Sequence, residues 1–345
     1  MVTSLCVEVP KKEAEDALRL LRNAGCLRRG LRPRSVGEYL RVPVEECPQL
    51  SEIVSSRGWA ICRDEFQESM LGKTFKDLLK GAVPDEVLEE VPRSYQLVGD
   101  IALIHLPPEA EEYGRIIGEA IMKVSKGVRA VYSAGPVKGE YRVRSLRLIA
   151  GEPKTSTIHR EYGVSICVDV EKTYFNPSLS EEHVRVARMV RDGEAVADLF
   201  CGVGPFTLQI AALRREVVIY AVDINPHAIT CLLRSLQINR GLRGKVQAVC
   251  GDASVFLEAV KDGFFHRIIM NLPHGAINFL GKASRKLRCG GVIHLYTVAG
   301  SAEEAVSLVQ DAAGDVRGLR VREVLRVLDY APHKYVYRVD VYKEC

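Results

Sequence analysis

The chain has 345 residues, of which 47% are hydrophobic, enough for two or three domains with packed cores. No apolar run reaches the roughly 18 residues that a membrane-spanning helix needs. Met1–Lys12 also lacks the apolar core of a signal peptide, so we expect a soluble cytoplasmic protein with no membrane partner. The net charge of +4 permits a nucleic-acid partner without requiring one.

The first 65 residues predict a small α/β domain. Leu5–Val9 and Tyr39–Val44 resemble short strands, and Lys12–Ala24 carries apolar residues at helical spacing. The segment Glu65–Pro92 is charged, and we expect a linker and a helix there.

Residues 70–175 predict a middle α+β domain. Leu97–Leu106 indicates one buried strand, and Glu109–Val124 indicates an amphipathic helix. Two further strand-like runs lie around Arg129–Tyr132 and over Ser165–Val170.

Residues 176–345 alternate between helical patterns and apolar strands, which predicts an α/β domain. The expected strands are Ala195–Leu199, Val217–Val222, Val246–Cys250, Arg267–Met270, Gly291–Tyr296, Leu319–Val327 and Tyr335–Val341. Helices separate the first five, and the last two resemble a hairpin. This pattern favours a doubly wound, mostly parallel sheet with an antiparallel edge, preceded by the two smaller domains.

A strand, a glycine loop and a helix meet at residues 196–213. The first apolar run ends at Asp198, Gly202 and Gly204 follow, and a helical pattern begins at Thr207. Such a loop lets the backbone approach a ligand closely, although two glycines alone would also suit a tight turn. Asp223, which ends the next strand, suits the two hydroxyls of a ribose. Because Thr207 stands where a third glycine would complete the GxGxxG pattern, the loop predicts a nucleoside-containing cofactor and argues against a dehydrogenase.

Two further motifs end later strands. Asp252 precedes a helical pattern over Ala253–Val260 and fits an N-cap, a cofactor contact, or both. Asn271-Leu-Pro273 follows the strand Arg267–Met270 and predicts a rigid turn that presents polar groups.

Four motifs occur in a set order: Asp198-Leu-Phe-Cys-Gly-Val-Gly204, Asp223-Ile-Asn-Pro226, Gly251-Asp252 and Asn271-Leu-Pro273. Together they resemble class I S-adenosylmethionine-dependent methyltransferases, which have a Rossmann-like sheet, and more narrowly the archaeal and eukaryotic tRNA (guanine-37-N1)-methyltransferases. The narrower resemblance also rests on the segments Gly139–Arg144, Ile158–Gly163, Tyr174-Phe-Asn-Pro177 and Asp329-Tyr-Ala-Pro-His333. It implies S-adenosylmethionine as cofactor, tRNA as partner and a monomeric enzyme.

The resemblance also implies a set of site residues. Gly202 and Gly204 would pack against the methionine part of the cofactor, Asp223 would accept the ribose hydroxyls and Asp252 would approach the adenine. The full cofactor set is Asp198, Gly202, Gly204, Pro205, Phe206, Asp223, Ile224, Asp252 and Asn271. The implied catalytic set is Glu182, Arg142, Asn271, Pro273 and Tyr174.

Methylation at guanine N1 requires more than a methyl donor. N1 carries a proton at neutral pH, so a base must remove it while negative charge develops on O6. The resemblance implies Glu182 as the base and Arg142 as the group that stabilises O6. The alternative for Glu182 is a purely structural role, because acidic residues are favourable at a helix start, and Glu181 is the competing candidate for the base. Arg144 is the less favoured substitute for Arg142, and the two would share a face if both lie on one strand.

Two residues depart from the family pattern. His183 stands where we expect arginine, which would weaken charge assistance beside the base. Cys201 replaces a small residue in the glycine loop and is interpreted as a packing residue. The other nine cysteines include no CxxC pair, so we expect no metal site, and their apolar surroundings predict buried thiols. Disulfides remain possible.

The cluster Arg28, Arg29, Arg32 and Arg34 fits contacts to tRNA phosphates or a solvated loop. A target base in the anticodon loop must be splayed out to reach a pocket, which a single-stranded loop permits at low cost.

Other functions stay open at this point. An aminocarboxypropyl transferase of the wybutosine pathway would use the same scaffold and cofactor. A second methylation, of a tricyclic guanine derivative at position 37, is compatible with the same residues. A non-catalytic RNA-binding module would lack cofactor affinity, and a Rossmann oxidoreductase would need a complete glycine fingerprint.

Overall fold

The computed structural model describes residues 2–28, 30–67, 74–314, 316 and 318–345, and the chain forms two compact units. One unit comprises Met1–Arg93 and Leu106–Gly127. The other comprises Ser94–His105 and Val128–Cys345. No helix in the described ranges is long and apolar enough to cross a membrane.

The N-terminal part of the first unit is a four-stranded antiparallel sheet in the order β2-β3-β1-β4. Its elements are β1 (Val2–Pro10), α1 (Ala14–Asn23), β2 (Arg34–Val36), β3 (Tyr39–Pro43), α2 (Leu50–Arg57) and β4 (Ala60–Phe66). The two expected strands and the helix are confirmed, whereas β2 and β4 were missed because their residues are mostly exposed and form no apolar run. Disulfides join Cys6 to Cys62 and Cys26 to Cys47, so these four cysteines are not thiols.

The rest of the first unit is helical. It contains η1 (Lys11–Glu13) beside the sheet, then α3 (Phe75–Leu79), α4 (Asp85–Glu90), η2 (Pro108–Ala110) and α5 (Gly114–Val124). Two short helices therefore occupy the charged segment in which one was expected. Thr74 caps α3 by accepting a hydrogen bond from the Asp77 N–H, and Pro84 immediately precedes α4.

The second unit begins with a four-stranded sheet in the order β5-β6-β7-β8. The strands are β5 (Gln96–Val98), β6 (Ile101–Ile104), β7 (Ala130–Lys138) and β8 (Val143–Gly151). The expected single strand over Leu97–Leu106 is wrong, because Gly99 adopts a φ of +55° and turns the chain into a hairpin. β8 was missed because Ile149 is its one buried residue, so the strand forms no apolar run.

A two-stranded ribbon links this sheet to the large one. It consists of β9 (Ser156–Glu161) and β10 (Val164–Asp169), which pair antiparallel. The ribbon is held on α8 (Pro226–Ile238), since Ser235 Oγ accepts from the Cys167 N–H at 2.8 Å and Asn239 Oδ1 accepts from the Ser165 N–H at 2.9 Å. β10 was expected and β9 was not.

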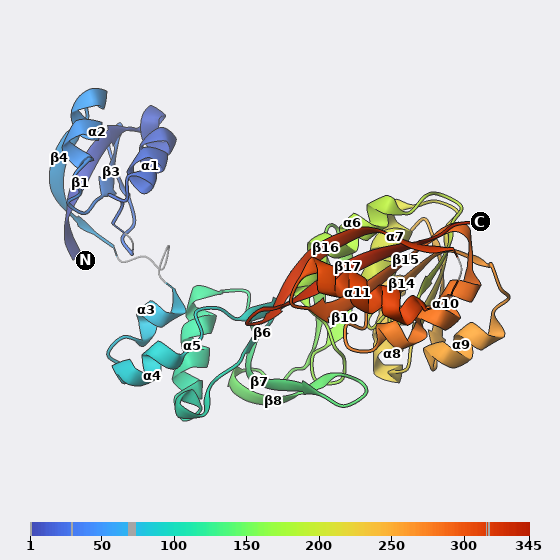
Figure 1. The fold of residues 1–345 in the computed structure, drawn as a ribbon. Helices are drawn as coiled ribbons and strands as arrows, with labels where there is room; N and C mark the ends of the chain where they lie inside the picture. Colours follow the sequence, from blue (N-terminus) through green and yellow to red (C-terminus); the bar gives the residue numbers. More distant parts are fainter. Residues whose placement is uncertain (1, 29, 68–73, 315, 317) are drawn as a thin grey trace. The chain divides into compact units, whose positions relative to one another are not determined.

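The large sheet has seven strands in the order β13-β12-β11-β14-β15-β17-β16. They are β11 (Ala195–Asp198), β12 (Val218–Asp223), β13 (Lys245–Cys250), β14 (Phe265–Met270), β15 (Leu287–Ala299), β16 (Leu319–Ala331) and β17 (Lys334–Lys343). The first five run parallel, and β17 pairs antiparallel with both β15 and β16. This confirms the predicted mixed sheet with its antiparallel edge, formed by the long red hairpin of Figure 1.

Helices cover both faces of this sheet. They are η3 (Pro177–Leu179), α6 (Ser180–Met189), α7 (Pro205–Leu213), α8, α9 (Ala253–Ala259), η4 (Ala276–Phe279), α10 (Leu280–Lys286) and α11 (Ala302–Ala313). Buried side chains of α6 and α7 pack with Val196 and Ile219, while those of α9, α10 and α11 pack with Ala197 and Val222. Neighbouring strand residues point to opposite faces, and helices bury both faces, so both faces of the sheet are apolar. The polar side chains gather at the ends of the strands.

Candidate cofactor and catalytic site

A cavity of about 240 Å³ lies at the carboxyl ends of β11, β12 and β14. Ligands of open α/β sheets bind at this edge. The cavity brings together most of the predicted site residues from distant parts of the chain. Those that line it are Arg142, Tyr174, Gly202, Pro205, Asp223, Ile224, Asp252, Asn271 and Pro273. Glu182, Asp198, Gly204 and Phe206 lie behind its surface.

The glycine loop turns because its two glycines have left-handed backbones. Gly202 has a φ of +54° and Gly204 a φ of +82°. A Cβ on Gly204 would stand 2.4 Å from Leu232 Cδ1, so this glycine lets α7 approach α8. A Cβ on Gly202 would meet only the Tyr174 carbonyl oxygen, at 3.7 Å. Gly202 therefore exposes backbone to the cavity, and Gly204 serves packing.

Asp223 ends β12 beside this loop. Its Oδ2 accepts from the Gly202 N–H at 2.7 Å, and its Oδ1 accepts from the Asn225 N–H at 2.9 Å. Burial raises the pKa of Asp223, and these two backbone hydrogen bonds oppose the rise. Each carboxylate oxygen keeps a further lone pair, and the side chain lines the cavity. This arrangement fits the two hydroxyls of a ribose.

Asp252 combines both of its predicted roles. Its Oδ1 caps α9 by accepting from the Ser254 and Val255 N–H groups at 2.8 and 3.0 Å. The residue is exposed and also lines the cavity. The cap leaves Oδ2 without a hydrogen bond to any residue that the structure describes.

Asp198 and Phe206 face the interior instead of the cavity. Asp198 is fully buried and accepts a hydrogen bond from the Thr207 hydroxyl at 2.8 Å. Burial, together with the nearby charge of Asp223, raises the pKa of Asp198 to about 7. The ring of Phe206 packs edge-on against His183, with 4.7 Å between ring centroids. Both residues therefore support the loop from behind.

The Asn271-Leu-Pro273 turn and Arg142 line another part of the same cavity. The turn follows β14, as expected. Arg142 precedes β8 in a left-handed turn, with a φ of +53°, and its guanidinium carbon lies 5.0 Å from the centroid of the Tyr174 ring. Arg142 and Arg144 do not share a strand face, because only Arg144 lies on β8 and the condition for a shared face is not met.

Glu182 is buried beneath the cavity in an ionic network. Its Oε1 accepts from the Tyr296 hydroxyl and from Arg338 Nη1, each at 2.8 Å. Its Oε2 has no hydrogen-bond partner among the described residues and lies 3.5 Å from Arg185 Nη1. One oxygen is thus occupied by two donors, and the other can accept a proton.

The network continues through the sheet beyond Arg338. Arg338 Nε donates to Asp340 Oδ1 at 2.9 Å, and His294 Nδ1 lies 2.6 Å from the same oxygen. Burial raises the pKa of Asp340, but the contacts with His294 and Arg338 outweigh it and hold that pKa below its usual value. His294 Nε2 in turn lies 2.5 Å from Arg267 Nη1. A buried carboxylate keeps its charge only with such partners.

Sequence reasoning missed Tyr296, Arg338 and Asp340. The signal was the charged pair in the run Tyr335–Val341, where Arg338 and Asp340 lie two apart and share one face of β17. Charged residues inside a buried strand indicate an internal network of ion pairs and hydrogen bonds.

The two neighbours of Glu182 differ sharply. Glu181 is exposed, accepts from the Tyr162 hydroxyl and does not line the cavity. His183 is buried, lines the cavity and places its Nδ1 2.8 Å from Glu161 Oε2. Cys201 is buried in the loop, and burial raises the pKa of its thiol, in keeping with a packing residue.

Two arginines of the N-terminal basic cluster form hydrogen bonds with neighbouring side chains. Arg34 Nη1 donates to Asp64 Oδ1 at 3.0 Å, and Arg28 Nη1 donates to Ser4 Oγ at 3.1 Å. Arg29 lies outside the described residues. No group of three or more metal-ligating side chains occurs in the part of the chain that the structure describes.

Three family descriptions match successive parts of the chain. Residues 6–49 match the tRNA methyltransferase 5 N-terminal domain, residues 75–155 match the TYW2 N-terminal domain, and residues 157–321 match the TRM5/TYW2 methyltransferase domain. The tRNA (guanine(37)-N(1))-methyltransferase Trm5b of Pyrococcus abyssi is 35% identical over 98% of each chain.

Two solved structures are similar to this chain over nearly its full length. The structure of aTrm5 in complex with tRNALeu is 30% identical, covers 99% of this chain and 100% of its own, and has a TM-score of 0.72. Methanocaldococcus jannaschii Trm5 in complex with adenosine is 30% identical over 99% of each chain, with a TM-score of 0.66. The chain described here belongs to the TRM5/TYW2 family of class I S-adenosylmethionine-dependent tRNA methyltransferases.

Proposed function

We propose that this enzyme transfers a methyl group from S-adenosylmethionine to N1 of guanosine 37 in the anticodon loop of tRNA. The observation that carries the proposal is a single cavity that joins the ribose-type carboxylate Asp223, the Asn271-Leu-Pro273 turn and the Arg142 guanidinium. The Pyrococcus abyssi relative, which is 35% identical, is named as a methyltransferase that acts on this same position.

The cofactor would be held by the glycine loop and two strand-end carboxylates. Gly202 presents backbone, Asp223 accepts the ribose hydroxyls, and Asp252 lies at the adenine end, with Pro205 and Ile224 as walls. When bound, S-adenosylmethionine supplies an electrophilic methyl group. The role of these residues is to orient it, since methyl transfer depends on alignment of donor and acceptor.

The guanine would be bound and activated by side chains from three segments. Asn271 hydrogen-bonds the edge of the base, and Pro273 keeps that turn rigid. Tyr174 forms a wall of the pocket and, through its ring contact, holds Arg142. Arg142 stabilises the negative charge that develops on O6.

Glu182 would accept the N1 proton on Oε2. The donors Tyr296 and Arg338 stabilise the ionised carboxylate through Oε1, so Oε2 alone is free of hydrogen bonds among the described residues. The residue does not line the cavity, whereas Leu179 and His183 on either side of it do. Proton transfer therefore requires the bound base to reach Oε2 directly or through one water.

Each of three domains would have its own role. Residues 1–65 contact tRNA, residues 70–175 form the middle domain, and residues 176–345 bind the cofactor. The enzyme would act in the cytoplasm as a monomer. Of the basic cluster in the first domain, Arg28 and Arg32 form no ion pair with a described residue, and they would contact the phosphates.

Nucleoside mass spectrometry tests the reaction. A tRNA transcript with guanosine at position 37 is incubated with the enzyme and S-adenosylmethionine, beside a transcript with adenosine there. We expect 1-methylguanosine from the first transcript alone. An aminocarboxypropyl mass shift on a suitably modified tRNA would favour the wybutosine-pathway reaction instead, and the absence of any modification would favour an RNA-binding role.

The base assignment is tested by Glu182→Gln, with Glu181→Gln as the matched control. Under single-turnover conditions, we expect Glu182→Gln to slow methyl transfer by 10²- to 10⁴-fold, the usual contribution of a general base. Cofactor affinity, measured by calorimetry, should change little. If Glu182→Gln kept the rate of the unaltered enzyme while methyl transfer is the rate-limiting step, Glu182 would not be the base.

A further inference from the structure

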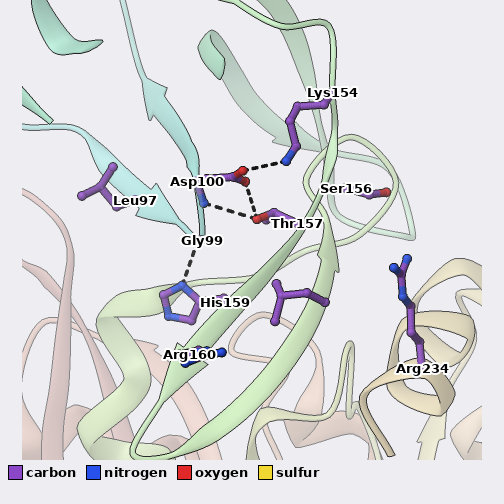
Figure 2. Close-up of a pocket in the computed structure, with 10 residues that line it drawn as sticks. Leu97, Gly99, Asp100, Lys154, Ser156, Thr157, His159, Arg160 and Arg234 are labelled. Carbon is purple, nitrogen blue, oxygen red and sulfur yellow. Dashed lines mark hydrogen bonds and ion pairs between the residues drawn. The ribbon is translucent and has the colours of Figure 1, made fainter. Parts of the chain in front are cut away.

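A second, larger hollow lies in the catalytic unit outside the cofactor cavity. It is open to solvent, has a volume of about 730 Å³, and is bounded by the β5–β6 turn, the strand β9 and the helix α8 (Figure 2). Neither the cofactor set nor the catalytic set contributes a residue to it. Its charged lining residues are mainly cationic, with Lys154, Arg160 and Arg234 against Asp100.

The inner wall of the hollow is preformed by hydrogen bonds. Lys154 Nζ donates to Asp100 Oδ2 at 2.7 Å, and the Thr157 hydroxyl donates to Asp100 Oδ1 at 2.6 Å. The Gly99 N–H donates to His159 Nδ1 at 3.1 Å. Among the described residues that line the hollow, Asp100 is the one carboxylate, and a lysine already neutralises it.

Two arginines on the rim have no such partner. Arg160 projects from β9 and Arg234 from α8, and both are exposed (Figure 2). Neither guanidinium has an ion pair or hydrogen bond to any described residue, whereas Arg129, on the same unit, pairs with Glu152 at 2.7 Å. Two uncompensated guanidinium groups around one hollow provide a binding site for phosphate oxygens.

The lining favours a nucleic-acid backbone over a base. Leu97 and Ile158 are its apolar members, and no Phe, Tyr or Trp is among the described lining residues, so a base would find no ring on which to stack. The hollow also shares a wall with the cofactor cavity. The His159 ring packs edge-on against Phe175 with 5.1 Å between centroids, and Phe175 lines that cavity.

We propose that this hollow binds the phosphate backbone of the tRNA anticodon arm through Arg160 and Arg234. The inference rests on the proposed function, because it places the hollow next to the pocket that receives guanosine 37. Contacts of this kind set the register of the RNA without reading its sequence.

Equilibrium binding of tRNA across a potassium chloride series tests the proposal. The variant is Arg160→Ala/Arg234→Ala, and the matched control is Arg240→Ala/Arg285→Ala, which removes the same charge from exposed positions that do not line the hollow. Each lost phosphate contact should lower the slope of log K against log salt by about 0.9, and affinity by roughly fivefold to tenfold near 0.1 M salt. The loss should persist with an isolated anticodon stem-loop.

The outcomes separate this proposal from the function itself. Methyl transfer to guanosine 37 by the unaltered enzyme tests the function, and the variant should keep its cofactor affinity and its rate at saturating tRNA. An unchanged salt slope, or a decrease equal to that of the control variant, would overturn the proposal. Saturable binding of inorganic phosphate that depends on both arginines, with tRNA binding unchanged, would also overturn it and assign the hollow to a small anion.

Discussion

Asp198 should make the folded state less stable as pH rises from about 4 to about 7. Its carboxyl group is fully buried at the end of β11, and its Oδ1 has no hydrogen-bond partner among the described residues. Burial, reinforced by the charge of Asp223, raises its pKa from 3.8 to about 7. The folded state therefore holds this proton to a higher pH than the unfolded state does.

The direction and the size of this change in unfolding free energy follow from proton linkage. A carboxyl group with a raised folded-state pKa favours folding most at low pH, and that contribution is lost between about pH 4 and pH 7. The shift of 7 − 3.8 = 3.2 pH units corresponds to roughly 4 kcal/mol over the whole window. Between pH 5 and pH 8 the loss is roughly 2.5 kcal/mol.

Asp198→Asn removes the titration and keeps an oxygen that can accept from Thr207. We expect the difference in unfolding free energy, variant minus wild type, to rise by roughly 2.5 kcal/mol from pH 5 to pH 8 in urea titrations. Asp311→Asn, on the exposed face of α11, is the control and should show no such trend. A difference that stays constant with pH would refute the reasoning, because Asp198 would then be ionised in both states.

Three other predictions concern the loop, the cofactor and the base. Gly204→Ala should lower the unfolding free energy by at least 1–2 kcal/mol in urea, because of its φ of +82° and the contact with Leu232, whereas Gly241→Ala, with open space around it, should not. Asp223→Asn should weaken cofactor binding at least tenfold in calorimetry, since hydrogen bonds to a charged group contribute about 1.5–3 kcal/mol, and an unchanged affinity would exclude its ribose contact. Tyr296→Phe removes one of the two hydrogen bonds that hold Glu182 Oε1, a bond to a charged group worth about 1.5–3 kcal/mol, so single-turnover methyl transfer should slow by about tenfold, and an unchanged rate would leave Tyr296 a purely structural role.

Local sequence patterns predicted most of the large sheet. Apolar runs located its seven strands, and the hairpin-like pair formed by the last two indicated the antiparallel edge. Prediction failed for strands with a single buried residue, as in β4 and β8, because such strands need no apolar run. It also joined β5 and β6 into one strand, since the left-handed turn at Gly99 interrupts an apolar segment without changing its composition.

The sequence by itself determined the cofactor loop, because the spacing from Asp198 through the glycines to Asp223 is a local property of one strand–helix–strand unit. Only the tertiary structure decided which side chains face the cavity. Phe206 turns to the core, and Asp198 is buried behind the loop. Glu182 receives its hydrogen bond from Arg338, 156 residues further along the chain. Such pairings depend on strand order and helix rotation, which are set by packing of the whole sheet and leave no local periodicity to detect.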